Sequence, residues 1–564
     1  MTRLTSWLAI IWTLLFLTAA APPANGADVW EVLAKASPDE CFYGVGDDNN
    51  EFPLIGSCNA PGQLKTNEAY IWGMTKYGDN IFFGTGPNVH CLVIQGYLGE
   101  NDPVLTDEYV CEASANPPWG DVRPPGMYMY NHQTGLTRLN DLVPLPIQPL
   151  VQSTLGIRSA GSHNGVAYLA GPGFGGSVNM FAFNADTGAF LGATQIAGYS
   201  NVRKWLVGSD NKLYVGLGGG ALGGAVWRWT GPGLFEFEEV GVGLDDDAAE
   251  LTEHDGRIFV NTWPGGLATA GLWMSPPLAQ LSAVTSLGAA APSGGWEKVW
   301  DVDEYEPDPV TARTYGGGAL ASFDGWLYWG TMHVPGMSLL AHDIFYGPAP
   351  DEDAAEARFL GTWRAISVFR GRSFNTPEQE IELLYGGQTG VPLGSFSGSP
   401  AWFLFPIFAP PVPTGEMQAY LCDDPGCNPF DPGAPRSWQT VLNKMGQVPT
   451  YGSAGFDNVF NNYCWTMSVL NDALYVGTMD CSFLILGGID PSEIPEGLEY
   501  EFGADLYRME SEAAPVSLDG MGNPTTYGIR TMVSDDNARE IPRLMESEPW
   551  YQTTMHSILA LPIR

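Results

Sequence analysis

Residues 462–482 read NYCWTMSVLNDALYVGTMDCS, a complete β-hairpin in one short segment. A first apolar strand leads to Asn471-Asp472, residue types that tolerate the positive φ of a tight two-residue turn. The second strand is rich in Leu, Tyr and Val, which suits a buried sheet, and it ends at Gly477, where the backbone can bend. A Cys stands near each end of the segment.

Versions of this hairpin recur along the chain, at residues 70–85, 157–171, 202–217, 248–262, 318–331 and 464–478. A seventh copy, at 364–387, is interrupted by an insertion over 370–380. A further strand follows several copies, at 126–130, 178–184, 225–229, 271–274 and 504–509. Antiparallel units repeated about every 45 residues are typical of a β-propeller. We therefore predict an all-β propeller of seven antiparallel blades, with six or eight blades as the alternatives.

The C-terminal part contains one incomplete copy. Residues 527–537, YGIRTMVSDDN, resemble a first strand and turn, but no matching second strand follows. This segment either closes the ring by pairing with an N-terminal blade or begins an eighth blade. Short helices are predicted as decorations at 438–445 and 538–546.

The chain divides into three parts. Residues 1–27 have the pattern of a secretory signal peptide, with Arg3 before an apolar segment over 7–17 and small residues over 24–27. Residues 28–68 are predicted to be an irregular lead-in, and residues 69–564 the propeller. No later apolar run is long enough to span a bilayer. We expect an exported protein, secreted or periplasmic, with no transmembrane anchor.

Composition narrows the possible partners. Gly (70) and Pro (44) are abundant among the 564 residues, which favours turns over long helices. The net charge is −38 although only 16% of residues are charged, because Lys and Arg are scarce. Such a surface repels phosphate backbones and argues against nucleic-acid binding. Ca²⁺ is the candidate cofactor, because oxygen ligands abound, although no ordered calcium-loop motif is present.

Eight Cys in an exported chain predict disulfides. Their spacing favours sequential, local pairs: Cys41 with Cys58, Cys91 with Cys111, Cys422 with Cys427, and Cys464 with Cys481. The last pair is placed symmetrically about the turn at Asn471. A metal site built from Cys is disfavoured, because the chain has no CxxC.

Three blocks carry a resemblance to a known group: residues 69–92 (AYIWGMTKYGDNIFFGTGPNVHCL), 461–480 (NNYCWTMSVLNDALYVGTMD) and 527–532 (YGIRTM). They resemble secreted proteins of the propeller type, most of which are uncharacterised. The segment MFAFNADTGAFLG, at 180–192, is similar to the blade repeat of quinoprotein-like propellers, and the repeats also resemble those of WD40-like propellers. The resemblance implies the fold and export, and transfers no catalytic residue.

Candidate ligand-binding residues lie just after the second strands, where loops of different blades converge. His333 and Asp480 stand three residues beyond the bending Gly of their copies. Trp263 takes a similar place in its copy, and His90 lies slightly further along in another. These four residues could form an axial mouth, while the alternative is that they are ordinary hydrogen-bonding loop residues. His163 and His254 occupy turn positions, so we expect them on the opposite face.

The leading functional interpretation is binding of a small molecule, a glycan or an extracellular protein partner at the axial mouth. The alternative is an extracytoplasmic hydrolase, or a metal- or quinone-dependent oxidoreductase, that uses His90, His333 and Asp480. Several enzyme classes lack their motifs here. There is no GxSxG, no Ser-x-Asp-x-Gly-x-x-Trp box and no adjacent Cys pair. A purely structural or cell-surface role is the third hypothesis.

Overall fold

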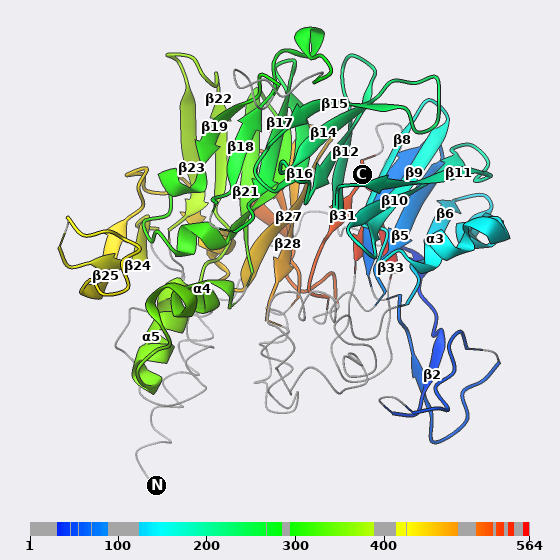
Figure 1. Ribbon diagram of the computed structural model, residues 1–564, viewed down its shortest axis with the longest axis horizontal. Helices are drawn as coiled ribbons and strands as arrows, with labels where there is room; N and C mark the ends of the chain where they lie inside the picture. Colours follow the sequence, from blue (N-terminus) through cyan, green and yellow to red (C-terminus); the bar gives the residue numbers. More distant parts are fainter. Residues whose placement is uncertain are drawn as a thin grey trace.

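The structure is a computed structural model that describes residues 31–44, 47–54, 56–68, 70–87, 123–266, 268–284, 294–334, 336–387, 413–424, 426–482, 503–522, 526–534, 540–545 and 557–562. These residues form mostly β-structure, in small antiparallel sheets (Figure 1). The first strands of successive sheets contact one another around a common axis. The predicted fold class, an all-β propeller, is confirmed.

Each four-stranded unit is a meander in which sequence neighbours pair. The first unit contains β4 (Ile71–Tyr77), β5 (Asn80–Thr85), β6 (Met127–Asn131) and β7 (Gly135–Arg138). The second contains β8 (Ser159–His163), β9 (Val166–Gly173), β10 (Ser177–Asn184) and β11 (Phe190–Ala197). The third contains β12 (Asn201–Val207), β13 (Leu213–Gly218), β14 (Ala225–Trp229) and β15 (Phe237–Val242).

The remaining units follow the same plan. The fourth contains β16 (Asp247–His254), β17 (Arg257–Trp263), β18 (Gly271–Met274) and β19 (Glu297–Asp301). The fifth contains β20 (Tyr315–Phe323), β21 (Trp326–His333), β22 (Val368–Arg372) and β23 (Glu380–Gly386). The sixth contains β27 (Asn461–Leu470), β28 (Ala473–Asp480), β29 (Leu506–Met509) and β30 (Ala513–Ser517). The last contains β31 (Thr531–Met532), β32 (Glu540–Met545), β33 (Ser557–Pro562) and β1 (Glu31–Lys35).

The first strands of these units form a closed ring. In the described part of the chain, β4 contacts β8, and the series continues through β12, β16, β20, β27 and β31 back to β4. The final unit joins both ends of the chain, because β1 pairs with β33, with Glu31 opposite Ala560. Seven four-stranded units therefore surround the axis among the described residues, while the predicted blade number for the entire chain stays a prediction.

The hairpin turns have the geometry expected from their residues. Asn471 and Asp472 have φ values of 47° and 59°, and Leu470 pairs with Ala473 across them. Asn and Asp adopt this left-handed backbone conformation more readily than most other residues. This preference explains why they recur between the first two strands of each unit.

Aromatic and aliphatic side chains fill the space between neighbouring sheets. Tyr168 stacks on Trp205 of the next unit, with ring centroids 5.4 Å apart and planes 9° from parallel. Trp329, fully buried in the fifth unit, stacks on Phe369 and meets the edge of Trp300 from the fourth. Burial of several aromatic rings at each junction supplies much of the hydrophobic stabilisation of the ring.

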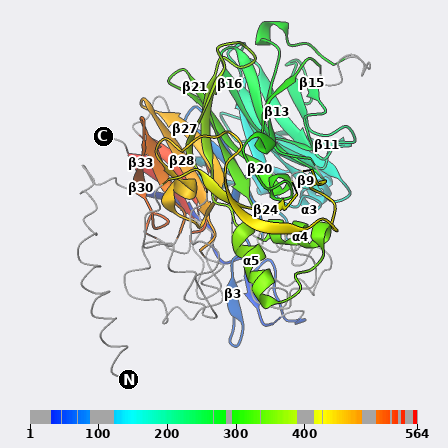
Figure 2. The same cartoon turned by 90° about the vertical axis from the view of Figure 1, so that its left-hand side faces the viewer.

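Insertions decorate the ring. Helices α4 (Met337–Tyr346) and α5 (Glu352–Thr362) lie beside the hairpin of β24 (Glu416–Cys422) and β25 (Arg436–Leu442), as Figures 1 and 2 both show. The shorter elements are β2 (Glu40–Phe42), β3 (Gln63–Lys65), β26 (Gly452–Ser453), α3 (Gln148–Gln152), and the 3-10 turns η2 (Leu139–Leu142), η3 (Leu145–Ile147), η4 (Leu278–Gln280), η5 (Val302–Glu304), η6 (Thr311–Thr314) and η8 (Ala454–Asp457).

The structure corrects three expectations about secondary structure. The supposed seventh copy, 364–387, is not a separate blade, because β22 and β23 are the outer strands of the fifth unit. Residues 438–445 and 538–546 were predicted as helices, but β25 and β32 occupy most of them. The lead-in 28–68 is not wholly irregular, since it contains β1, β2 and β3. An apolar strand pattern identifies a sheet but does not say which neighbour it pairs with.

Two of the predicted disulfides form, Cys41–Cys58 and Cys422–Cys427. The pair Cys464–Cys481 was wrong: both are buried free thiols. Thr478 pairs opposite Cys464, because the turn contains only two residues and β27 carries bulges, whereas the backbone N–H of Cys481 donates to the carbonyl of Phe460. Cys91 and Cys111 lie outside the described residues, as does the predicted signal peptide.

Candidate functional site

A pocket of about 710 Å³ lies on the axis of the ring, and we call it the axial pocket. All seven first strands, from β4 to β31, contribute residues to its lining. Its wall extends along these strands toward the turns that join first and second strands. The pocket is therefore a product of ring closure, because no single unit could form it.

β-Bulges displace two tryptophans at the start of first strands. The register of β4 shifts between Ile71 and Gly73, and that of β27 shifts between Cys464 and Thr466, so Trp72 and Trp465 are the extra residues. A bulge turns the side chain of its extra residue away from the regular alternation. Trp72 lines the axial pocket, whereas Trp465 is buried and packs against Tyr70.

Arginines occupy the same sequence position in three other units. Each follows a buried Ile or Val at the start of the first strand, as Trp72 follows Ile71: Arg158 after Ile157, Arg203 after Val202, and Arg530 after Ile529. All three arginines and Trp72 line the axial pocket. We call Arg158, Arg203 and Arg530 the arginine layer.

Each guanidinium of the arginine layer lies over the indole of a neighbouring unit: Arg158 over Trp72 at 5.1 Å, Arg203 over Trp263 at 5.0 Å, and Arg530 over Trp465 at 5.7 Å. Stacking of this kind stabilises a cation and fixes the plane of its donors, because the ring face carries negative electrostatic potential. The arginines are thus held in place before any ligand arrives.

Tyr70 lies among the tryptophans on which two of these arginines stack, because its ring contacts Trp72 and Trp465. Burial raises the pKa of its phenol, and the positive charges of Arg530, Arg158 and Arg203, in that order, partly oppose the effect. Tyr70 belongs to an aromatic cluster with Trp72, Trp465 and Tyr527 that packs behind the arginine layer.

Polar residues hold part of this layer. Arg158 Nη1 donates to Asn201 Oδ1 at 2.8 Å, and Asn201 Nδ2 donates to Asp247 Oδ2 at 2.5 Å. Arg203 Nη1 lies 3.9 Å from the same Asp247 oxygen. This chain of contacts fixes two arginines relative to each other across neighbouring units.

Charge in the axial pocket has the opposite sign to that of the chain. The protein has 25 Lys and Arg against 63 Asp and Glu. The charged residues that line the pocket are Lys76, Arg158, Arg203, Lys204, Arg530, Glu250 and Glu253. Five cations therefore face two carboxylates, one of which, Glu250, pairs with Lys204 at 3.2 Å. Such a concentration of positive charge in a concave site attracts anions.

His333, one of the four predicted site residues, is buried at the end of β21 with an exposed fraction of 2%. Its Nε2 lies 2.9 Å from Thr314 Oγ1 and 2.7 Å from Ser338 Oγ. Burial, helped by the charge of Arg364, lowers the pKa of His333 to about 3. The imidazole is therefore neutral in the folded protein near neutral pH.

Asp480 is also buried, at the end of β28. Its Oδ2 accepts from Asn458 Nδ2 at 2.9 Å, and the same amide nitrogen lies 3.2 Å from Asp505 Oδ2. Burial raises the pKa of Asp480, with the nearby charge of Asp505 acting in the same direction. Asp480 therefore belongs to an internal hydrogen-bond network rather than to the lining of the axial pocket.

Of the four predicted residues, the structure describes Trp263, His333 and Asp480, and none of these three lines the axial pocket. Trp263 reaches the axis indirectly, by stacking under Arg203, and its Nε1 donates to the carbonyl of Gly317 at 3.0 Å. His333 and Asp480 are buried, and His90 lies outside the described residues. Sequence reasoning missed the arginine layer. The signal that could have revealed it is the repeated Arg after Ile or Val in a chain poor in cations.

Two further observations concern metal ligands and membrane-spanning helices. Among the described residues, no three side chains of His, Cys, Asp and Glu gather closely enough to hold a metal ion. Within the same residues, no helix has the length and apolar character needed to cross a bilayer. Ca²⁺ stays a prediction without an assigned site.

Comparisons with known proteins find only distant structural similarity. No protein-family model and no curated protein matches the sequence. Among solved structures, the β-propeller domain of the Trilobed protease from Pyrococcus furiosus is similar over 85% of this chain and 92% of its own, at 9% identity and a TM-score of 0.32. CoXyl43, a GH43 β-xylosidase/α-arabinofuranosidase from a compost microbial metagenome, is similar over 56% of this chain and 94% of its own, at 12% identity and a TM-score of 0.27. The strand pairings of the chain itself, and not these distant similarities, identify it as a β-propeller.

Proposed function

We propose that the protein binds a small organic anion in its axial pocket. The observation that carries this proposal is the arginine layer, three arginines from three units that all line the axial pocket. Arginine donates paired hydrogen bonds to carboxylate or phosphate oxygens in a fixed geometry. Three such groups around one point favour a ligand with at least one acidic group.

The rest of the axial pocket favours a ligand that also carries hydroxyl groups. Above the arginine layer, the lining contains hydroxyl side chains, among them Thr75 and Ser162, whose oxygens lie 2.9 Å apart. Glu250 and Glu253 add acceptors for hydroxyl donors. A sugar acid combines one carboxylate with several hydroxyls, and its apolar ring face could pack on Trp72 or Trp205, which also line the pocket.

The test compares galacturonate with galactose, which differ by the carboxylate. Isothermal titration at low salt should show binding of galacturonate and much weaker binding of galactose, and added NaCl should weaken the former. Arg530→Gln should lower the affinity about tenfold or more, because hydrogen bonds to charged groups contribute about 1.5–3 kcal/mol. Arg508→Gln is the matched control, since Arg508 lies outside the pocket and pairs with Glu510 at 2.5 Å.

Two outcomes would count against the proposal. Equal affinity for the two sugars would show that the arginine layer does not select the acid, and unchanged binding by Arg530→Gln would place the ligand elsewhere. The hydrolase alternative is checked in the same experiment with a methyl glycoside of galacturonate. Recovery of the intact glycoside supports binding, and release of methanol would favour hydrolysis.

We further propose that the protein works in the periplasm or outside the cell. The two disulfides support this location, because such bonds persist in oxidising compartments. Mass spectrometry of the mature protein from its native source should find the N-terminus after residue 27.

A further inference from the structure

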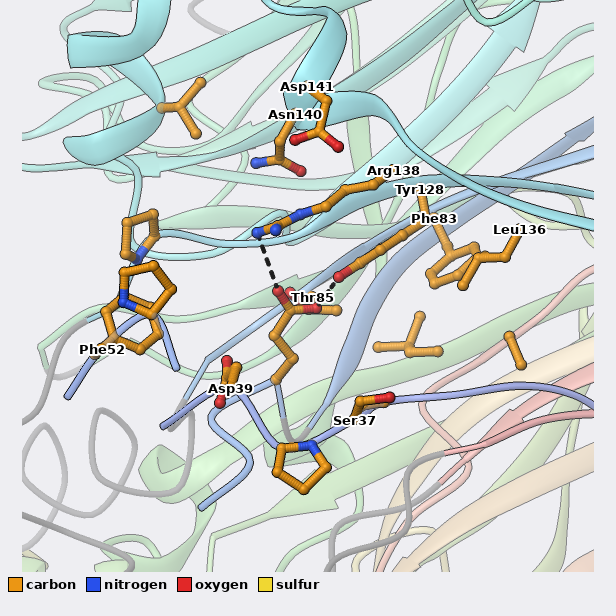
Figure 3. Close-up of a pocket in the computed structure, with 18 of the residues that line it drawn as sticks. Ser37, Asp39, Phe52, Phe83, Thr85, Tyr128, Leu136, Arg138, Asn140 and Asp141 are labelled. Carbon is orange, nitrogen blue, oxygen red and sulfur yellow. Dashed lines mark hydrogen bonds and ion pairs between the residues drawn. The ribbon is translucent and has the colours of Figure 1, made fainter. Parts of the chain in front are cut away.

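A second cavity, of about 520 Å³, lies between the segment that follows β1 and the first unit of the ring (Figure 3), and we call it the side pocket. Pro38 and Asp39 line it on one wall, and Phe83 and Tyr128 on another. None of its lining residues belongs to the axial pocket. A ligand here would bind independently of one on the axis.

Glu68 is the chemical centre of the side pocket. Its side chain is 12% exposed, and its Oε2 accepts a 2.5 Å hydrogen bond from the Tyr128 hydroxyl. Its Oε1 lies 3.9 Å from Arg138 Nη2, too far for a hydrogen bond. Arg138 and Asp39, both labelled in Figure 3, line the same cavity. One oxygen thus has room for a hydrogen-bond donor.

Glycine allows this arrangement. A Cβ atom at Gly126 would lie 2.4 Å from Glu68 Oε2, which is well inside the van der Waals contact distance. The carboxylate therefore rests directly on the backbone, and the Tyr128 hydroxyl fixes its orientation. The site is preformed, which lowers the entropic cost of binding.

Electrostatics define the ligand that would fit. Burial raises the pKa of Glu68 to about 7, opposed by the Tyr128 hydrogen bond and the Arg138 charge, while the charge of Asp39 adds to the increase. Burial likewise raises the pKa of Asp39. Asp141, exposed on η2, also lines the cavity, so three carboxyl groups face one half-exposed arginine. Among the described lining residues Arg138 is the cation, and its guanidinium, 3.9 Å from Oε1, makes no hydrogen bond to Glu68.

We propose that the side pocket binds a small organic amine, whose ammonium group pairs with the Glu68 carboxylate. Its apolar part packs against Phe52 and Leu136, side chains that line the cavity and are 37% and 46% exposed. Tyr128 orients the carboxylate, and Asp39 adds a second negative charge. This inference is independent of the function proposed for the axial pocket.

Benzylamine is the probe, and benzyl alcohol is its neutral counterpart. Titration calorimetry of the full-length protein should show one benzylamine site and no binding of the alcohol. The affinity should rise about tenfold from pH 6 to pH 8, because ionised Glu68 grows from about one tenth to nine tenths of the molecules while the amine stays protonated. Binding at pH 6 should release a proton, measured as a heat that depends on the buffer.

Glu68→Gln should lower the affinity at pH 8 at least tenfold and abolish the proton release. Glu51→Gln is the matched control, an exposed acid of the lead-in outside the cavity. Equal affinity for amine and alcohol, a flat pH profile in the wild type, or unchanged binding by Glu68→Gln would each overturn the proposal. The first two results need no variant, and Arg530→Gln should leave benzylamine binding unaltered, which separates this site from the axial one.

Discussion

Replacement of His333 tests the burial of a neutral imidazole at the end of β21. Its folded-state pKa of about 3 lies below the ordinary value near 6.5. Below pH 6.5 the unfolded chain binds a proton at this position and the folded chain does not, so folding stability falls as the pH falls. At about 1.36 kcal/mol per pH unit, His333 should cost about 2 kcal/mol of stability between pH 7 and pH 5.

The assay is urea unfolding of the wild type and of His333→Gln, followed by tryptophan fluorescence at several pH values from 5 to 7. Gln cannot bind a proton at this position. Relative to the wild type, the unfolding free energy of the variant should therefore rise by about 2 kcal/mol between pH 7 and pH 5. His132→Gln, in an exposed turn between β6 and β7, is the control and should show no such shift. A pH-independent difference for His333→Gln would refute the buried, neutral assignment.

Three other outcomes are expected. Gly84→Ala should destabilise the protein by about 1–3 kcal/mol in denaturant titrations, because its Cβ would lie 2.2 Å from the Cβ of buried Ile157. Deletion of Glu31–Lys35, the whole of β1, should lower the melting temperature measured by circular dichroism, and an unaltered melting curve would argue against ring closure by this strand. Cys464 and Cys481 should stay unreactive toward a thiol reagent in the native protein and react after unfolding, because burial raises the pKa of both thiols. A disulfide between them, found by peptide mapping, would contradict the structure.

The fold could be predicted from the sequence because its repeats are local. Each Asn-Asp or Asp-Gly turn between apolar strands encodes a hairpin that needs no distant partner to be recognised. Pairings between hairpins were harder to predict. The segment 364–387 has the same strand pattern as a first hairpin, yet its strands lie at the outer edge of the fifth unit. The alternation of apolar and polar side chains determines which face of a strand is buried, but it does not determine which other strand pairs with it.

The site was predicted less well, for a physical reason. His333 and Asp480 stand at strand ends, but polar side chains there can turn inward to satisfy buried backbone and neighbouring side chains. Arg203 lies at a register shift of β12, and the arginine layer as a whole depends on the closure of the ring, so its members are far apart in the sequence. Only an alignment of the repeats on one another would have placed Arg158, Arg203 and Arg530 at one level.

The pairing of β1 with β33 also constrains the order in which the units of the ring can fold. During synthesis β1 appears first and has no partner in its sheet until β33 has been made. The last unit can therefore form only after β33 has been made, and contacts between distant residues slow this step. Until then β1 is an unpaired edge that could join another chain. β1 must therefore stay unpaired until β33 has been made. This order of folding suits a chain that is kept unfolded until export, which the predicted signal peptide would direct.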